Sequence, residues 1–218
     1  MKIKLLLFLP VLMALVCSAS AQADLNGDMM VIRANLDLSG VQDYYDQGYF
    51  VSTYNTDQGY GVGLEFYHSF LFRSTAGFGI RYELERALSG TNYKYRFVPV
   101  YFTAMFAPFY NPRDFLPYFK FETGFNVLFL GNNDFNTTAS GTATTNGGLY
   151  FAFGVGIKFM DSIFIDLMST SYSGTFSASN GVTYINETIR DYKVCLNLGF
   201  AFQIYSPEVN PGNNINDR

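Results

Sequence analysis

Eight segments of this 218-residue chain alternate between apolar and polar side chains with a period of two. In the first, Ile32 and Leu36 belong to the apolar set, while Arg33 and Asp37 belong to the polar set. Successive side chains of a β-strand point to opposite faces of a sheet, so this pattern predicts strands. Most segments have roughly the nine to eleven residues that a tilted strand needs to cross a bilayer. The segments are residues 31–39, 60–68, 76–85, 97–106, 119–129, 151–159, 163–167 and 193–204.

The beginning of the chain has the three parts of a secretory signal. Two lysines within residues 1–4 precede the apolar run 5–16, and residues 21–23 read Ala-Gln-Ala, a small-residue cleavage site. The apolar run is too short to cross about 30 Å of hydrocarbon as a helix. The expected organisation is a signal peptide over 1–23, one barrel domain over 24–205 and a polar tail over 206–218.

Composition excludes several classes of protein. The net charge of −4 argues against a basic nucleic-acid-binding protein. An aromatic content of 18% argues against disorder, which is typical of chains with few aromatic residues. Removal of residues 1–23 leaves Cys195 as the single cysteine, so no disulfide can form within the mature chain.

Two kinds of eight-stranded barrel fit the alternation. A soluble, lipocalin-like barrel turns its apolar face inward, whereas a membrane barrel turns it toward lipid. The polar face here carries few charges and many glycines, which suits a crowded interior, and the apolar face is rich in phenylalanine. Three long polar connections, 40–56, 131–147 and 174–187, alternate with shorter ones, as in membrane barrels. We therefore expect an all-β, eight-stranded, antiparallel up-and-down transmembrane barrel with both termini in the periplasm.

The polar face then lines the lumen of the barrel. It contributes five basic and six acidic residues, and buried charges are tolerated when they are paired. This near balance predicts a network of ion pairs that fills the lumen; an ion-selective pore is the alternative interpretation. The predicted network consists of Arg33, Asp37, Glu65, Arg81, Glu83, Glu85, Lys120, Glu122, Lys158, Asp166 and Lys193.

No catalytic or metal-binding motif is recognisable. The single histidine, His68, is adjacent to Ser69 and falls near a predicted periplasmic turn. One histidine and Cys195 cannot build a zinc site, so we expect no enzyme activity, no metal and no cofactor. The first long connection contains Asp43 and Asp46 among several tyrosines; it could be a recognition surface, a weak cation site or a solvated loop.

The last segment carries a more specific pattern. Asn197, Gly199, Phe202 and Ile204 occupy the fixed positions of the sequence polar, any, Gly, any, any, apolar, any, apolar. With this pattern and its eight segments, the chain resembles the small eight-stranded outer-membrane β-barrel proteins, which include OmpX and the transmembrane domain of OmpA. The resemblance implies the outer membrane of a Gram-negative bacterium and recognition of this strand by the barrel-assembly machinery. One departure is that residues 206–218 follow the strand, whereas many members end on an aromatic residue.

These observations lead to one functional expectation and two alternatives. The expectation is a monomeric outer-membrane protein with a plugged lumen, in contact with membrane lipid, that acts structurally or binds an unknown surface ligand through its loops. The first alternative is a porin-like narrow pore or transporter for small solutes. The second is a secreted, lipocalin-like carrier. No nucleic-acid partner is expected.

Overall fold

The computed structural model describes residues 28–46, 48–71, 74–87, 94–108, 115–131, 142–159, 162–179 and 184–205. The expected signal peptide (1–23) and polar tail (206–218) lie outside the described residues. In the described ranges, no helix has the length and apolar character needed to cross a membrane.

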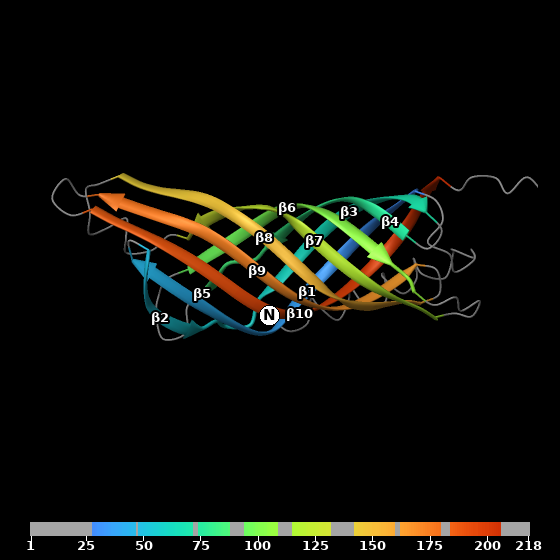
Figure 1. The fold of residues 1–218 in the computed structure, drawn as a ribbon, viewed down its shortest axis with the longest axis horizontal. Coiled ribbons are helices and arrows are strands. Elements are labelled where there is room, and N and C mark those ends of the chain that lie inside the picture. The colour runs from blue at the N-terminus through green and yellow to red at the C-terminus, as the bar shows by residue number, and fades with distance from the viewer. Residues whose placement is uncertain are drawn as a thin grey trace, which may run out of the picture.

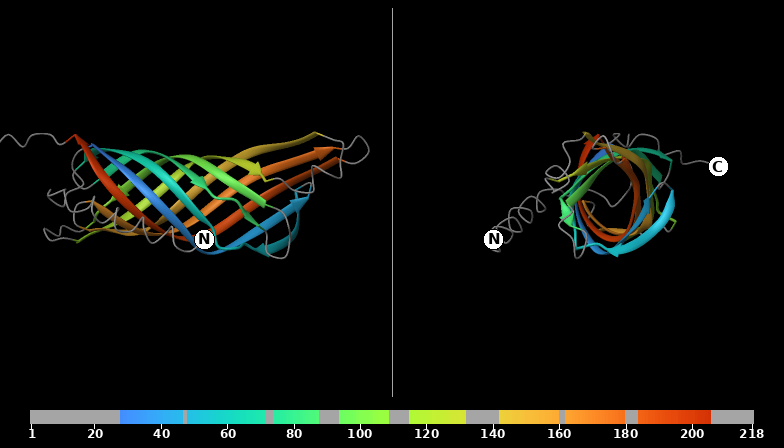
Figure 2. Two further views of the ribbon diagram at one scale, coloured as in Figure 1. Left: turned by 180° about the vertical axis from the view of Figure 1, so that it is seen from behind. Right: turned by 90° about the vertical axis from the view of Figure 1, so that its left-hand side faces the viewer.

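The described residues form ten antiparallel strands of one sheet. Each main strand pairs with the next along the chain, and β10 pairs with β1, so the sheet closes on itself as a ring (Figures 1 and 2). The strands are β1 (Asp28–Asp46), β2 (Tyr49–Asn55), β3 (Tyr60–Leu71), β4 (Ser74–Glu83), β5 (Arg86–Ala87), β6 (Lys94–Phe106), β7 (Phe115–Leu130), β8 (Thr142–Phe159), β9 (Ile163–Ser179) and β10 (Tyr184–Tyr205).

Ten strands give eight positions around the barrel wall, because two positions are each occupied by two consecutive strands. Both β2 and β3 pair with β1, and both β4 and β5 pair with β6. The prediction of an eight-stranded, antiparallel up-and-down barrel is confirmed. The first residue of β1 and the last of β10 lie at one end of the barrel, which we name the terminal end; the opposite end, which holds Asp46 and Tyr184, is the distal end (Figure 1).

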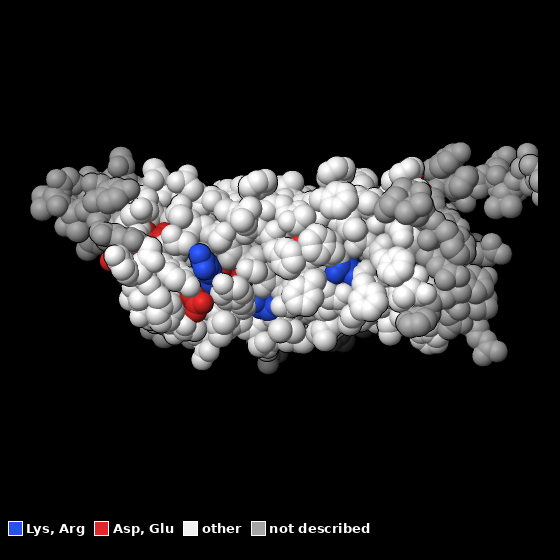
Figure 3. All heavy atoms as spheres, viewed as in Figure 1, with Lys and Arg blue, Asp and Glu red and all other residues white. Residues whose placement is uncertain are grey.

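The alternation separates an apolar exterior from a mixed interior. Phenylalanines such as Phe78 and Phe125 point outward, and the latter is 71% exposed. Over the side of the molecule in Figure 3, charged groups are few and most of the surface is uncharged. Water would not favour so much exposed aromatic surface, whereas acyl chains do. A closed ring also leaves no unpaired strand edge in the hydrocarbon, where unsatisfied backbone groups are costly.

Two of the three expected long connections, 40–56 and 174–187, are largely strand, whereas most of the third, 131–147, lies outside the described residues. Residues 40–56 form the ends of β1 and β2, joined across a turn in which Gly48 has φ of +88°. Likewise β8 begins at Thr142, while β9 and β10 extend through most of 174–187. The prediction of loops in 40–56 and 174–187 was wrong, because tyrosine and threonine also suit paired strands that continue beyond the membrane.

Register irregularities correct two further expectations. The pairing of β1 with β10 shifts between Asp37 and Ser39, so Ser39, which the period of two in segment 31–39 would place on the same face as Asp37, is exposed instead. One extra residue in β1 at this shift exchanges the inward and outward positions for the residues that follow. Gln42 is therefore buried inside the barrel. Near the terminal end, the period of two in segment 193–204 would place Gln203 on the inner face with Asn197, but Gln203 is exposed, and the register shifts next to its partner Met29.

Candidate functional site

The inner face of the barrel gathers the predicted ionic residues into the lumen. Ten of the eleven are buried, with at most 4% of each residue exposed. The ten are Arg33, Asp37, Glu65, Arg81, Glu83, Lys120, Glu122, Lys158, Asp166 and Lys193.

Glu85 is the exception, and its placement in the lumen was wrong. Its side chain is 41% exposed on the outer surface, where its carboxylate lies 3.7 Å from Arg96. β4 and β5 occupy the same place in the barrel wall, but the chain is not strand between Glu83, which ends β4, and Arg86, which begins β5. The alternation of faces therefore changes phase at this point, and Arg86 takes the inward place that the sequence pattern assigned to Glu85.

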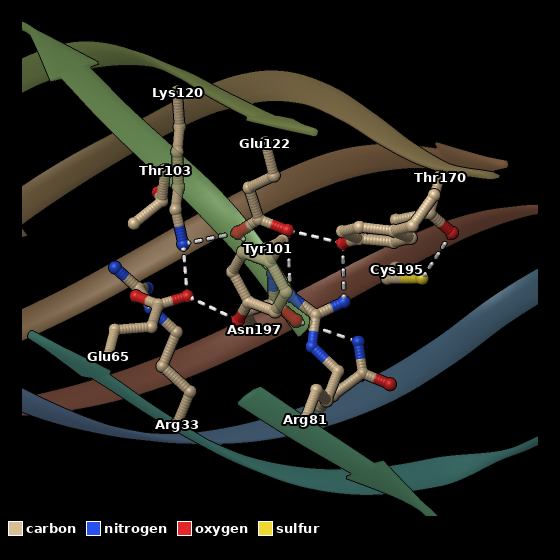
Figure 4. A network of polar contacts seen from close by, with 12 residues as sticks. Arg33, Glu65, Arg81, Tyr101, Thr103, Lys120, Glu122, Thr170, Cys195 and Asn197 are labelled. Atoms are coloured by element: carbon tan, nitrogen blue, oxygen red, sulfur yellow. Dashed lines mark hydrogen bonds and ion pairs between the residues drawn. The ribbon is translucent and has the colours of Figure 1, made fainter. Parts of the chain in front are cut away.

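A central cluster of charges occupies the middle of the lumen (Figure 4). Arg33 contacts the carboxylates of both Glu65 and Asp166. The ammonium of Lys120 lies 2.7 Å from Glu65 Oε1 and 2.7 Å from Glu122 Oε1. These residues come from β1, β3, β7 and β9, so the cluster links wall positions across the lumen.

Arg81 and two tyrosines extend this network toward the distal end. Arg81 Nη2 lies 3.0 Å from Glu122, and its Nη1 donates to the Tyr150 hydroxyl at 3.1 Å. The Tyr172 hydroxyl donates to Glu83, which belongs to the next group of charges. With Arg81 included, the central cluster has three basic and three acidic groups, so its formal charge is balanced.

A distal cluster follows, formed by Asp37, Glu83, Arg86, Asp191 and Lys193. The ammonium of Lys193 lies 2.6 Å from Glu83 and 3.2 Å from Asp191. Arg86 lies 2.7 Å from Glu83 and contacts Asp37. The sequence analysis missed Arg86 because of the phase change. It also missed Asp191, although Asp191 stands two residues before Lys193 and continues the same inward set.

Aromatic and aliphatic side chains fill the remaining space. At the terminal end, Val31, Leu116 and Phe164 belong to a cluster of buried apolar side chains, and the Lys158 ammonium lies 5.9 Å from the centre of the Phe164 ring. Around the charges, Phe97 stacks on Tyr172 with ring centres 5.2 Å apart. Large side chains and paired charges thus occupy the inner face of the barrel along its length.

The residues of the final-strand pattern divide between the two faces. Asn197 and Gly199 are buried inside, whereas Phe202 and Ile204 lie on the outer side. Asn197 accepts a hydrogen bond of 2.7 Å from Asn35. A Cβ atom at Gly199 would meet Arg33 at 3.1 Å, so the glycine leaves room for that guanidinium.

The residues considered for catalysis or metal binding are dispersed. His68 is exposed near the terminal end, with Nδ1 2.5 Å from the carboxylate of Asp28. Cys195 is buried in the lumen and donates to Asp37 at 3.1 Å. Among the described residues, no group of three or more His, Cys, Asp or Glu side chains is arranged to hold a metal ion.

Comparisons with known proteins define the class of fold. No family model matches the chain, and no curated protein matches its sequence. Among solved structures, it is similar to the outer membrane protein OprG from Pseudomonas aeruginosa, with a TM-score of 0.51, 15% identity, and 82% of this chain and 97% of that chain covered. It is also similar to the outer membrane protein AlkL, solved in lipid bilayers, with a TM-score of 0.54, 10% identity, and 87% and 96% covered.

At such low identity the likeness establishes the fold alone. The chain folds as a small, closed, eight-stranded barrel of the kind found in outer-membrane proteins of Gram-negative bacteria.

Proposed function

We propose that the protein is an integral outer-membrane barrel with a sealed lumen, which acts structurally or binds partners through its distal end. The observation that carries this proposal is the contrast between the two faces. Phenylalanines cover the outside, while Arg33, Arg81 and Lys120 are paired with carboxylates and closely packed inside. A lumen filled in this way suits a stable scaffold better than a conduit.

The proposed orientation places both termini in the periplasm and the distal end outside the cell. The hairpin of β1 and β2 then presents exposed aromatic residues, including Tyr49 and Phe50, to the surroundings. Tyrosine, serine and asparagine are common in adaptable contact surfaces, so this hairpin is our choice for contact with a surface ligand. The proposed role is non-enzymatic, since the single histidine, His68, pairs with Asp28 near the terminal end, which this orientation places on the periplasmic side.

Planar-bilayer recording tests the sealed lumen against the alternative of a narrow pore. The purified protein is expected to give no single-channel conductance in potassium chloride. A variant with both Arg81→Ala and Tyr150→Ala, which removes two large lumen side chains, is the control that should leak. Discrete conductance from the wild-type protein would contradict the proposal and favour the pore.

Location and orientation need a separate experiment. An epitope inserted after Gly48, an exposed turn residue, should be digested by protease added to intact cells. An epitope attached after Arg218 should survive until the outer membrane is permeabilised. The protein should also fractionate with the outer membrane and need detergent to stay dispersed. A monodisperse, detergent-free protein would instead support the secreted carrier.

Recognition of Asn197, Gly199, Phe202 and Ile204 by the barrel-assembly machinery is part of the proposal. Phe202 and Ile204 lie on the outer face near the terminal end of β10, where another protein could reach them before membrane insertion. Replacing both with serine should lower the amount of protein in the outer membrane. The same purified variant should still refold in detergent, since neither side chain contributes to the lumen.

A further inference from the structure

The distal cluster carries unequal numbers of acidic and basic groups. Its acids are Asp37, Glu83 and Asp191, and its bases are Arg86 and Lys193. All five residues are at most 3% exposed. With every group ionised, the cluster would therefore hold one uncompensated negative charge away from water, which is costly inside a protein. The central cluster, in which acids and bases are balanced, has no such excess.

Among the described residues, no further basic side chain at the distal end points toward this cluster. Lys94, Arg96 and Arg190 occupy outward positions of β6 and β10. Lys158 faces inward, but it lies at the terminal end beside the Phe164 ring. The connections between distal strand ends that fall outside the described ranges contain no lysine or arginine; they are residues 47, 88–93, 132–141 and 180–183. The excess charge therefore calls for a partner other than a basic side chain.

Asp191 is the carboxylate that the two bases hold least closely. The Lys193 ammonium lies 2.6 Å from Glu83 but 3.2 Å from Asp191. Arg86 lies 2.7 Å from Glu83 but 4.0 Å from Asp191. Asp191 Oδ2 also accepts a hydrogen bond of 3.3 Å from the Tyr95 hydroxyl, whereas Oδ1 has no hydrogen-bond partner among the described residues. A proton that neutralises the cluster is therefore best placed on Asp191.

Gln42 supplies a neighbour for that proton. It stands directly opposite Asp191 in the register of β1 with β10, and both side chains are fully buried. Residues paired in this way have Cβ atoms about 4.5–5.5 Å apart. The amide Oε1 of Gln42 has no hydrogen-bond partner among the described residues, and a neutral carboxyl group has an O–H to donate. We propose that the distal cluster is a proton-binding site, in which neutral Asp191 donates to Gln42.

Occupation of this site makes the fold sensitive to pH. With Asp191 neutral, Asp37 and Glu83 balance the two bases. An aspartate of the unfolded chain is ionised at neutral pH, so the folded chain binds one more proton than the unfolded chain. Stability should therefore fall as the pH rises and Asp191 loses its proton. The charged and titratable groups around Asp191 are Asp37 and Tyr44 on β1, Glu83 on β4, Arg86 on β5, Tyr95 on β6, Tyr172 on β9, and Glu187 and Lys193 on β10.

Infrared spectroscopy of the purified protein in lipid vesicles detects the proton directly. A protonated carboxyl group has a carbonyl band separate from the bands of ionised carboxylates. At neutral pH we expect this band in the wild type and its loss in Asp191→Asn. The matched control is Asp166→Asn, which alters an equally buried aspartate of the balanced central cluster and should keep the band.

Urea unfolding at a series of pH values measures the consequence. Above the pH at which the infrared band disappears, the unfolding equilibrium constant of the wild type should rise about tenfold per pH unit relative to that of Asp191→Asn. Absence of the band from the wild type would overturn the proposal, even if Asp191→Asn fails to fold. Persistence of the band in Asp191→Asn, or the same pH dependence in both proteins, would also overturn it.

Discussion

Neutralising Glu65 is the sharpest test of how the lumen is held together. This carboxylate is fully buried, contacts Arg33 and accepts a hydrogen bond of 2.7 Å from the ammonium of Lys120. It also accepts hydrogen bonds from the hydroxyls of Tyr67 and Tyr101, at 2.7 and 2.8 Å. Glu65→Gln keeps the shape of the side chain but leaves the central cluster with an excess positive charge.

The expected loss of unfolding free energy is large. Removing one partner of a buried ion pair costs about 3–5 kcal/mol, because the remaining charge is left without compensation in a medium of low polarity. Since 1.4 kcal/mol corresponds to about tenfold in an equilibrium constant, the folded population should fall by at least about a hundredfold relative to the unfolded one. Arg33 and Lys120 keep Asp166 and Glu122, which places the loss at the lower part of this range.

The assay is urea unfolding of the protein in lipid vesicles, followed by the difference in gel migration between folded and heated samples. Glu85→Gln is the matched control, since it also neutralises one glutamate in an ion pair. That pair is partly exposed, with 3.7 Å between Glu85 and Arg96, so its loss should cost less than about 1 kcal/mol. Equal destabilisation by the two substitutions would refute the reasoning that burial of paired charge stabilises this barrel.

Other substitutions test the outer face, the tyrosine bridge and the close approach of strands. Phe121→Lys, on the outside of β7, should destabilise the protein in vesicles by about 2–4 kcal/mol near the bilayer midplane; no loss in urea titrations would argue against lipid contact. Tyr172→Phe removes the hydrogen bond to buried Glu83 and should cost about 1.5–3 kcal/mol in the same titration. Gly77→Val should sharply lower refolding yield on gels, because a Cβ there collides with the neighbouring strand's backbone, whereas Gly48→Asn should refold normally.

The sequence was sufficient to predict the two faces wherever the alternation runs without interruption. Lys120 and Glu122 on β7, and Lys193 and Asn197 on β10, all point inward as their spacing predicts. β7 pairs regularly with β6 along this stretch, and the extra residue opposite β10 belongs to β1, so the period of two within β7 and β10 carries directly into space.

The wrong predictions of inner and outer faces occur where the alternation of side chains is interrupted by a register shift or a break in a strand. The shift after Asp37 and the break before Arg86 each move later residues to the opposite face. Such irregularities depend on how neighbouring strands align, so they leave little trace in a single sequence. The pairing of Arg33 with Asp166 is equally invisible, because it joins residues 133 positions apart through the closed barrel.

The ion pairs across the lumen also limit the route by which the protein can enter a membrane. Arg33 on β1 finds its partners on β3 and β9, and Lys193 on β10 finds Glu83 on β4. A lone hairpin inserted ahead of the others would expose these charges to hydrocarbon, at a cost of several kcal/mol for each. We therefore expect strands early and late in the chain to cross the bilayer together. Insertion is then a single cooperative step that requires the last strand, β10, to be in place.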